Sequence, residues 1–212
     1  MDTSIKLAGY LLQIKAIIIN PANPFTWASG WKSPIYCDNR KTLSYPEIRN
    51  FIRDKLAALI RDGFGLPDII AGVATGAIAQ GALVSDRLNL PFVYVRSSAK
   101  DHGTGNLIEG DVTAGKSVVV VEDLISTGGS SLRAVNALRE AGLNVPGMVA
   151  IFSYGFDVAM ENFRKEGVTL YTITDYHTLI EHGIKTGYVQ PQFLGTLKKW
   201  REDPDHWGKT FN

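Results

Sequence analysis

The segment VVVVEDLISTGGSS, residues 118–131, carries the clearest structural pattern in the chain. Its four consecutive valines, without polar alternation, predict a strand covered on both faces, as in a parallel sheet. Glu122 and Asp123 follow where this strand is expected to emerge, and the small residues 126–130 then lead into a helix over about 129–141. In open α/β sheets, ligands bind at the carboxyl ends of such strands.

The chain around this segment alternates between short apolar runs and amphipathic stretches. We predict a fold of the α/β class, in which a mostly parallel sheet is flanked by helices. The predicted strands cover 68–73, 91–95, 117–121, 148–152 and 168–172. Further predicted helices cover about 77–88 and 158–165.

The N-terminal part has a different character. An amphipathic helix is predicted there from the spacing of its apolar residues, Leu7, Leu11, Ile14, Ile17 and Ile18. An irregular, aromatic-rich segment over 23–40 follows, which we call the hood. Ser44 and Glu47 match a capping box, with Pro46 suited to the first turn of the next helix.

These patterns predict one domain over residues 1–212. We expect the N-terminal helix and hood over about 1–45, an α/β core over 46–190, and a C-terminal helix and tail over 191–212. The formal net charge is +1, with 22 basic and 21 acidic residues, which predicts neither nucleic-acid nor membrane binding. Cys37 is the only cysteine in the sequence, so an intrachain disulfide is excluded and a cytoplasmic location is favoured.

The segment 122–130, which we call the cradle, has the composition of a phosphate site. A turn of small residues before a helix exposes backbone N–H groups at the positive end of the helix dipole, and Gly128 and Gly129 permit close approach. The hydroxyls of Ser126, Thr127 and Ser130 add donors. The two acids upstream would repel a bare phosphate, but they could accept hydrogen bonds from the vicinal hydroxyls of a ribose. The alternative is an ordinary strand–turn–helix with exposed acids.

The cradle resembles the signature of type I phosphoribosyltransferases, which bind 5-phosphoribosyl 1-diphosphate (PRPP). Two other segments resemble orotate phosphoribosyltransferases: 95–110, VRSSAKDHGTGNLIEG, is similar to their mobile catalytic loop, and 25–40, FTWASGWKSPIYCDNR, to their hood. The resemblance implies transfer of the phosphoribosyl group to orotate, giving orotidine 5′-monophosphate and diphosphate in de novo pyrimidine synthesis. A phosphoribosyltransferase for another base and a non-catalytic PRPP-binding regulator remain alternatives.

The resemblance also implies roles for individual residues. Lys100, His102 and Asp123 would be catalytic, and Ser126 would contact orotate. The implied PRPP contacts are Arg96, Lys100, His102, Glu122, Asp123, Leu124, Ile125, Ser126, Thr127, Gly128, Gly129 and Ser130. It further implies a Mg²⁺ cofactor, with no protein ligand that we can name, and a homodimer with shared active sites.

Three lysines of some family members are absent from this chain. Their positions are occupied by Ala28 in the hood, Gly76 and Ser97. Lys32 and Arg40 are therefore the candidates to replace the hood lysine on the orotate carboxylate.

Overall fold

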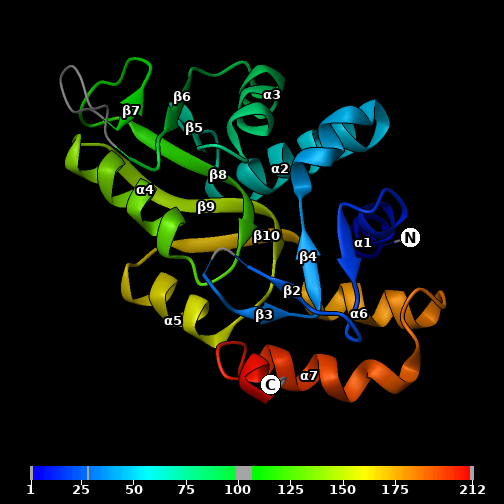
Figure 1. Cartoon of the computed structure of the whole chain (residues 1–212). Helices are drawn as coiled ribbons and strands as arrows, with labels where there is room; N and C mark the ends of the chain where they lie inside the picture. The colour runs from blue at the N-terminus through cyan, green and yellow to red at the C-terminus, as the bar shows by residue number, and fades with distance from the viewer. Residues whose placement is uncertain (1, 28, 99–106, 211–212) are drawn as a thin grey trace.

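The computed structural model describes residues 2–27, 29–98 and 107–210. Six of the described strands form one sheet in the order β10-β9-β8-β5-β6-β7 (Figure 1). These strands are β5 (Ile69–Val73), β6 (Phe92–Val95), β7 (Ile108–Glu109), β8 (Ser117–Ile125), β9 (Asn144–Ser153) and β10 (Thr169–Asp175). Only β7 runs antiparallel to its neighbour, so the predicted mostly parallel α/β sheet is confirmed.

Helices cover both faces of this sheet (Figure 1). The chain crosses from β5 to β6 in one direction along the sheet and from β8 to β9 in the other, so right-handed crossovers put their connecting helices on opposite faces. The helices are α1 (Thr3–Gln13), α2 (Pro46–Phe64), α3 (Ile78–Leu88), α4 (Gly129–Glu140), α5 (Asp157–Lys165), α6 (Tyr176–Lys185) and α7 (Leu194–Glu202). Among the described helices, none is long and apolar enough to cross a membrane.

The valine run lies at the centre of the core. Residues 118–121 belong to β8 and are fully buried between the parallel neighbours β5 and β9. The strand is longer than the predicted range 117–121 and continues to Ile125. Glu122 and Asp123 therefore lie within the strand and not after it, and the backbone ladder holds their positions.

The N-terminal helix is shorter than predicted. It ends at Gln13, and Ile17 and Ile18 belong to β1 (Ile17–Ile19), which pairs antiparallel with β4 (Ile35–Cys37). Lys15 adopts a left-handed conformation with φ of 53°, which stops the helix. The isoleucines that follow are β-branched and suit a strand, so the prediction of one continuous helical face was wrong.

The predicted capping box is also wrong, although Pro46 does begin the helix. Ser44 is the last residue of the 3₁₀ helix η1 (Asn39–Ser44), and Tyr45 is the N-cap of α2 without a side-chain hydrogen bond. The carboxylate of Glu47 instead accepts a hydrogen bond from the hydroxyl of Tyr10, at 2.9 Å. A tertiary contact has thus replaced the local one.

The hood packs against the core through aromatic rings. It contains the short antiparallel pair β2 (Phe25–Thr26) and β3 (Lys32–Ser33), and Trp27 Nε1 donates to the carbonyl of Ile35 at 3.1 Å. Trp27 also lies 5.1 Å from Tyr154 and 5.7 Å from Trp200, measured between ring centroids. The C-terminal 3₁₀ helices η2 (Pro191–Phe193) and η3 (Trp207–Thr210) flank α7. The aromatic cluster of Trp27, Tyr154 and Trp200 joins the hood, the end of β9 and α7.

Candidate active site

A cavity of about 400 Å³ opens at the carboxyl ends of the neighbouring strands β5 and β8. Its walls come from three parts of the chain: the hood with η1, the loop after β5, and the cradle. The lining residues are Cys37, Asp38, Arg40, Val73, Ala74, Thr75, Gly76, Glu122, Asp123, Leu124, Ser126, Thr127, Gly128 and Ser130. The cavity lies at the sheet edge where ligands bind in open α/β folds.

The turn of the cradle forms the N-terminus of α4. Gly128 is its N-cap, with φ of 82°, and a Cβ there would lie 2.8 Å from the ring of Phe163. Glycine is therefore required for both conformation and space. The first N–H groups of this 12-residue helix have no partners within the helix, and its dipole adds positive potential. The turn is suited to bind a phosphate group.

A second element supports this turn from outside. Asn162 on α5 donates its Nδ2 hydrogen to the carbonyl oxygen of Thr127, at 3.2 Å. The position of the turn therefore depends on α5 as well as on β8 and α4.

Glu122 is only 4% exposed, and both of its carboxylate oxygens accept hydrogen bonds. Oε1 accepts from the backbone N–H of Asp123 at 2.9 Å, and Oε2 accepts from the hydroxyl of Ser131 at 2.8 Å. Burial raises the pKa of Glu122 well above its ordinary value, and the charge of Asp123 adds to that rise. These bonds fix the side chain, so a ribose hydroxyl would use only its remaining lone pairs.

Asp123 is less enclosed and faces the cavity from the next position of β8. Burial raises the pKa of Asp123 as well. Its backbone carbonyl accepts a hydrogen bond from Nδ2 of Asn39, at 2.6 Å. Asn39 is 2% exposed, so a buried amide at the start of η1 ties the hood to the residue that we predict to be catalytic.

The loop after β5 forms another part of the wall. It contains a cis peptide between Ala74 and Thr75, followed by Gly76. A Cβ at Gly76 would overlap the carboxylate of Asp123. The lysine that some family members carry here therefore has no room beside Asp123 in this geometry.

The hood contributes a cation and an acid to the cavity. Nε of Arg40 lies 2.7 Å from Oδ1 of Asp38, and the hydrogen bond between them lowers the pKa of Asp38. Cys37 lies beside this pair, and burial raises the pKa of its thiol well above the ordinary value. A thiol that stays protonated is a poor nucleophile.

The structure brings most of the predicted site residues together. Glu122, Asp123, Leu124, Ser126, Thr127, Gly128 and Ser130 line one cavity, and Gly129 begins α4 beside them. Ile125 is fully buried in β8 and Arg96 lies outside the lining, where its Nη1 is 3.5 Å from Oε1 of Glu109. Lys100 and His102 lie outside the described residues.

Sequence reasoning missed Asn39 and Asn162 and left Arg40 undecided between two candidates. No local motif marks these residues, because each acts through a contact with a distant part of the chain. Asn39 and Asp123 are 84 positions apart.

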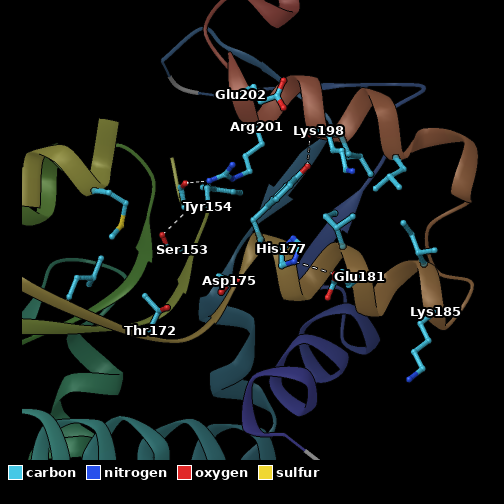
Figure 2. Close-up of a pocket in the computed structure, with 18 residues that line it drawn as sticks. Ser153, Tyr154, Thr172, Asp175, His177, Glu181, Lys185, Lys198, Arg201 and Glu202 are labelled. Carbon is cyan, nitrogen blue, oxygen red and sulfur yellow. Dashed lines mark hydrogen bonds and ion pairs between the residues drawn. The ribbon is translucent and has the colours of Figure 1, made fainter. Parts of the chain in front are cut away.

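A second cavity, of about 1060 Å³, lies between the ends of β9 and β10 and the helices α6 and α7 (Figure 2). Apolar side chains such as Tyr154, Ile180 and Leu197 line it, together with charged residues. Among these, His177 and Glu181 pair across one turn of α6 at 3.2 Å. The cradle is not part of this larger cavity, so volume alone does not identify the site.

The fold and the cradle together define a class of enzyme. A family model described as a phosphoribosyl transferase domain matches residues 43–169, which is more than half of the chain and includes the whole cradle. The resemblance found in the sequence is thereby confirmed at the level of the class.

Individual relatives narrow this class. The chain is 62% identical to the orotate phosphoribosyltransferase of Bacteroides thetaiotaomicron, over 94% of each chain, and 53% identical to that of Listeria innocua, over 99% of this chain and 100% of the relative. The crystal structure of orotate phosphoribosyltransferase from Aeropyrum pernix is 31% identical, with a TM-score of 0.75 over 86% of this chain and 99% of that one. The chain belongs to the orotate phosphoribosyltransferase family.

Proposed function

We propose that this protein transfers the 5-phosphoribosyl group of PRPP to orotate, yielding orotidine 5′-monophosphate and diphosphate for UMP synthesis. It acts as a pentosyl-transferring glycosyltransferase. The observation that carries the proposal is one cavity in which the phosphate-binding turn of α4 and the carboxylate of Asp123 face the same space. Membership of the family supports orotate as the base.

Different parts of the cavity wall bind different groups of PRPP. The turn at 126–130 binds the 5′-phosphate, with its backbone N–H groups and hydroxyls as donors. Asp123 accepts hydrogen bonds from the ribose hydroxyls, and Glu122 holds its backbone in place. The loop at 73–76 offers backbone groups to the diphosphate. By family resemblance, Ser126 contacts the base as well as the phosphate.

Negative charge builds up on the diphosphate as its bond to the ribose breaks. Arg96, Lys100 and His102 stabilise that charge, and His102 supplies a hydrogen bond or proton to it. By family resemblance the segment 95–110 closes over the reacting carbon and excludes water. The positions of Lys100 and His102 lie outside the described residues, so their roles rest on that resemblance.

The proposal includes a magnesium ion that arrives with its substrate. In the described part of the chain, the only group of three metal-ligating side chains that meet is Asp203, Asp205 and His206, which are exposed and far from the cradle in sequence. Mg²⁺ in such sites is held largely by substrate phosphates and water. When bound, it neutralises charge on the departing diphosphate.

We further propose a cytoplasmic homodimer in which the segment 95–110 of each subunit serves the partner's site. A mixing experiment tests this. If Lys100 acts across the interface, Lys100→Ala and Asp123→Asn subunits assembled together form dimers with one intact site, recovering up to about a quarter of wild-type activity. Absence of any recovery, with mixed dimers verified by mass, would overturn the shared site.

The activity itself is tested by following the loss of orotate absorbance in the presence of PRPP and Mg²⁺. We expect turnover that requires both, and that falls by orders of magnitude in Lys100→Ala while the unfolding curve stays unchanged. A panel of purine and pyrimidine bases separates this activity from that of an enzyme for another base. PRPP binding without turnover of any base would identify a regulator instead.

A further inference from the structure

Arg40 is the only cationic side chain among the described residues that line the cavity. The other candidate, Lys32, does not line it, because its Nζ donates to Oγ1 of Thr26 at 2.8 Å. A Cβ at Gly208 would overlap the side chain of Lys32, so the C-terminal tail also packs against this lysine. Of the two candidates for the orotate carboxylate, Lys32 and Arg40, only Arg40 therefore lines the cavity.

Neighbouring residues set the position of Arg40. Asp38 is the N-cap of η1 and accepts hydrogen bonds from both the backbone N–H and Nε of Arg40. Asn39, between them, is tied to Asp123. In the described part of the chain, Nε is the only side-chain nitrogen of Arg40 with a hydrogen-bond partner, and 58% of the side chain is exposed. The two Nη atoms thus remain available to a ligand in the cavity.

Arg40 and the phosphate turn line the cavity from different elements, η1 and the start of α4. Residues 126–130 form the turn before α4, Asp123 lies on β8, and Asn39 ties the segment that carries Arg40 to Asp123. A ribose 5-phosphate seated in the turn, with its diol on Asp123, directs its anomeric carbon away from the turn. The group attached to that carbon therefore approaches the hood.

We propose that the Nη atoms of Arg40 bind the carboxylate of orotate, which makes Arg40 the residue that selects a carboxylated pyrimidine. The planar guanidinium matches a carboxylate in geometry and donates charge-assisted hydrogen bonds. Asp38 keeps the guanidinium oriented, because it accepts the hydrogen bond from Nε. This inference rests on the proposed function, and it names the residue that recognises the base.

The experiment compares two ligands that differ only in the carboxylate: orotidine 5′-monophosphate and uridine 5′-monophosphate. Their dissociation constants are measured by titration calorimetry for the wild type, Arg40→Met and Arg40→Lys. We expect the wild type to prefer the carboxylated nucleotide and Arg40→Met to reduce that preference by about tenfold to a hundredfold, because a charge-assisted hydrogen bond is lost. Arg40→Lys should fall between them, since it keeps the charge and loses the fork.

Arg87→Met is the matched control. Nε of Arg87 lies 3.0 Å from Oδ1 of Asp54, and its side chain is 53% exposed, but it lies on α3 and does not line the cavity. Its nucleotide preference should equal that of the wild type. An unchanged preference in Arg40→Met, or weaker binding of PRPP with the preference retained, overturns the role of Arg40 alone. A wild type that neither binds nor forms orotidine 5′-monophosphate overturns the proposed function instead.

Discussion

The cradle and the hood face the same cavity, but they are built in different ways. The cradle consists of consecutive residues of one strand, one turn and one helix, with one hydrogen bond from α5 to support the turn. The hood reaches the cavity through single long-range contacts, such as the hydrogen bond from Asn39 to the carbonyl of Asp123. Continuous chain thus shapes the phosphate end, whereas tertiary packing shapes the end where we expect the base.

The cradle and the hood meet at Asp123, and we therefore expect catalysis to depend most on this residue. We expect Asp123→Asn to lower kcat/KM by about a hundredfold to a thousandfold, because a carboxylate that faces the reacting sugar is neutralised. Folding should not suffer, since burial raises the pKa of Asp123 and an amide avoids the desolvation of a charge. Steady-state kinetics and thermal unfolding measure the two effects.

Asp157→Asn is the control, because that side chain is fully exposed on α5. It should leave kcat/KM unchanged. Activity of Asp123→Asn within threefold of the wild type would show that the cradle binds the sugar without this acid.

Two asparagines separate the contributions of the two regions. Asn39→Ala removes the hydrogen bond from the hood to Asp123, and we expect kcat to fall by about tenfold to a hundredfold, because the acid is no longer held in place. Asn162→Ala removes the hydrogen bond to Thr127 in the turn, and we expect mainly a rise of a few fold in the KM for PRPP.

The assignment depends on this split between kcat and KM. If Asn39→Ala changed only the KM for PRPP, or if both variants behaved alike, the hood would act as a cover and would not position Asp123.

The same difference explains how far the sequence predicted the structure. The buried valine strand, the turn and the helix after it were predictable because their signals are local: apolar continuity, small residues and glycines in sequence order. The sheet class followed from the same pattern. The failures lie where a distant partner intervenes: Glu47 bonds to Tyr10 instead of Ser44, and Ile17 and Ile18 pair with β4.

In the candidate site, too, the residues that could be predicted are those with a signal in the local sequence. The residues of the cradle that line the cavity were recognisable from their types and order. Asn39 and Asn162 were not, because an asparagine has many ordinary roles and only packing shows which carbonyl it reaches. The role of Glu122 remains a prediction, with the new fact that both its oxygens already accept hydrogen bonds.

Two glycines test whether the turn depends on conformation alone. Gly115 and Gly128 have φ of 84° and 82°, but a Cβ at Gly115 would meet nothing within 4 Å, whereas one at Gly128 would meet Phe163. We expect Gly115→Ala to lower the free energy of unfolding by about 1–2 kcal/mol, from backbone strain. Gly128→Ala should lower it by about 1–3 kcal/mol more, from overpacking, and should weaken PRPP binding.

Urea unfolding of both variants and PRPP titration measure these effects. Equal losses of stability would mean that Phe163 yields to the added methyl group. Unchanged PRPP binding by Gly128→Ala would remove this turn from the phosphate site.

The smallest effect is expected at the other end of the strands that carry the site. Asp68, just before β5, accepts hydrogen bonds from the backbone N–H and the hydroxyl of Ser117, both at 2.8 Å, and from Lys116 at 3.0 Å. These bonds lower the pKa of Asp68 from 3.8 to about 2. Because the folded-state pKa is below the unfolded-state value, this stabilisation is complete above about pH 4 and is lost as the pH falls towards 2.

Asp68→Asn should therefore be slightly less stable than the wild type at neutral pH, with the gap in the free energy of unfolding closing on acidification, while orotate turnover at neutral pH stays unchanged. Urea unfolding from pH 7 down to the lowest pH at which the protein folds measures the gap. A gap that stayed constant with pH would show that the charge of Asp68 is not what joins β5 to β8, and a loss of turnover would show that the site depends on both ends of its strands.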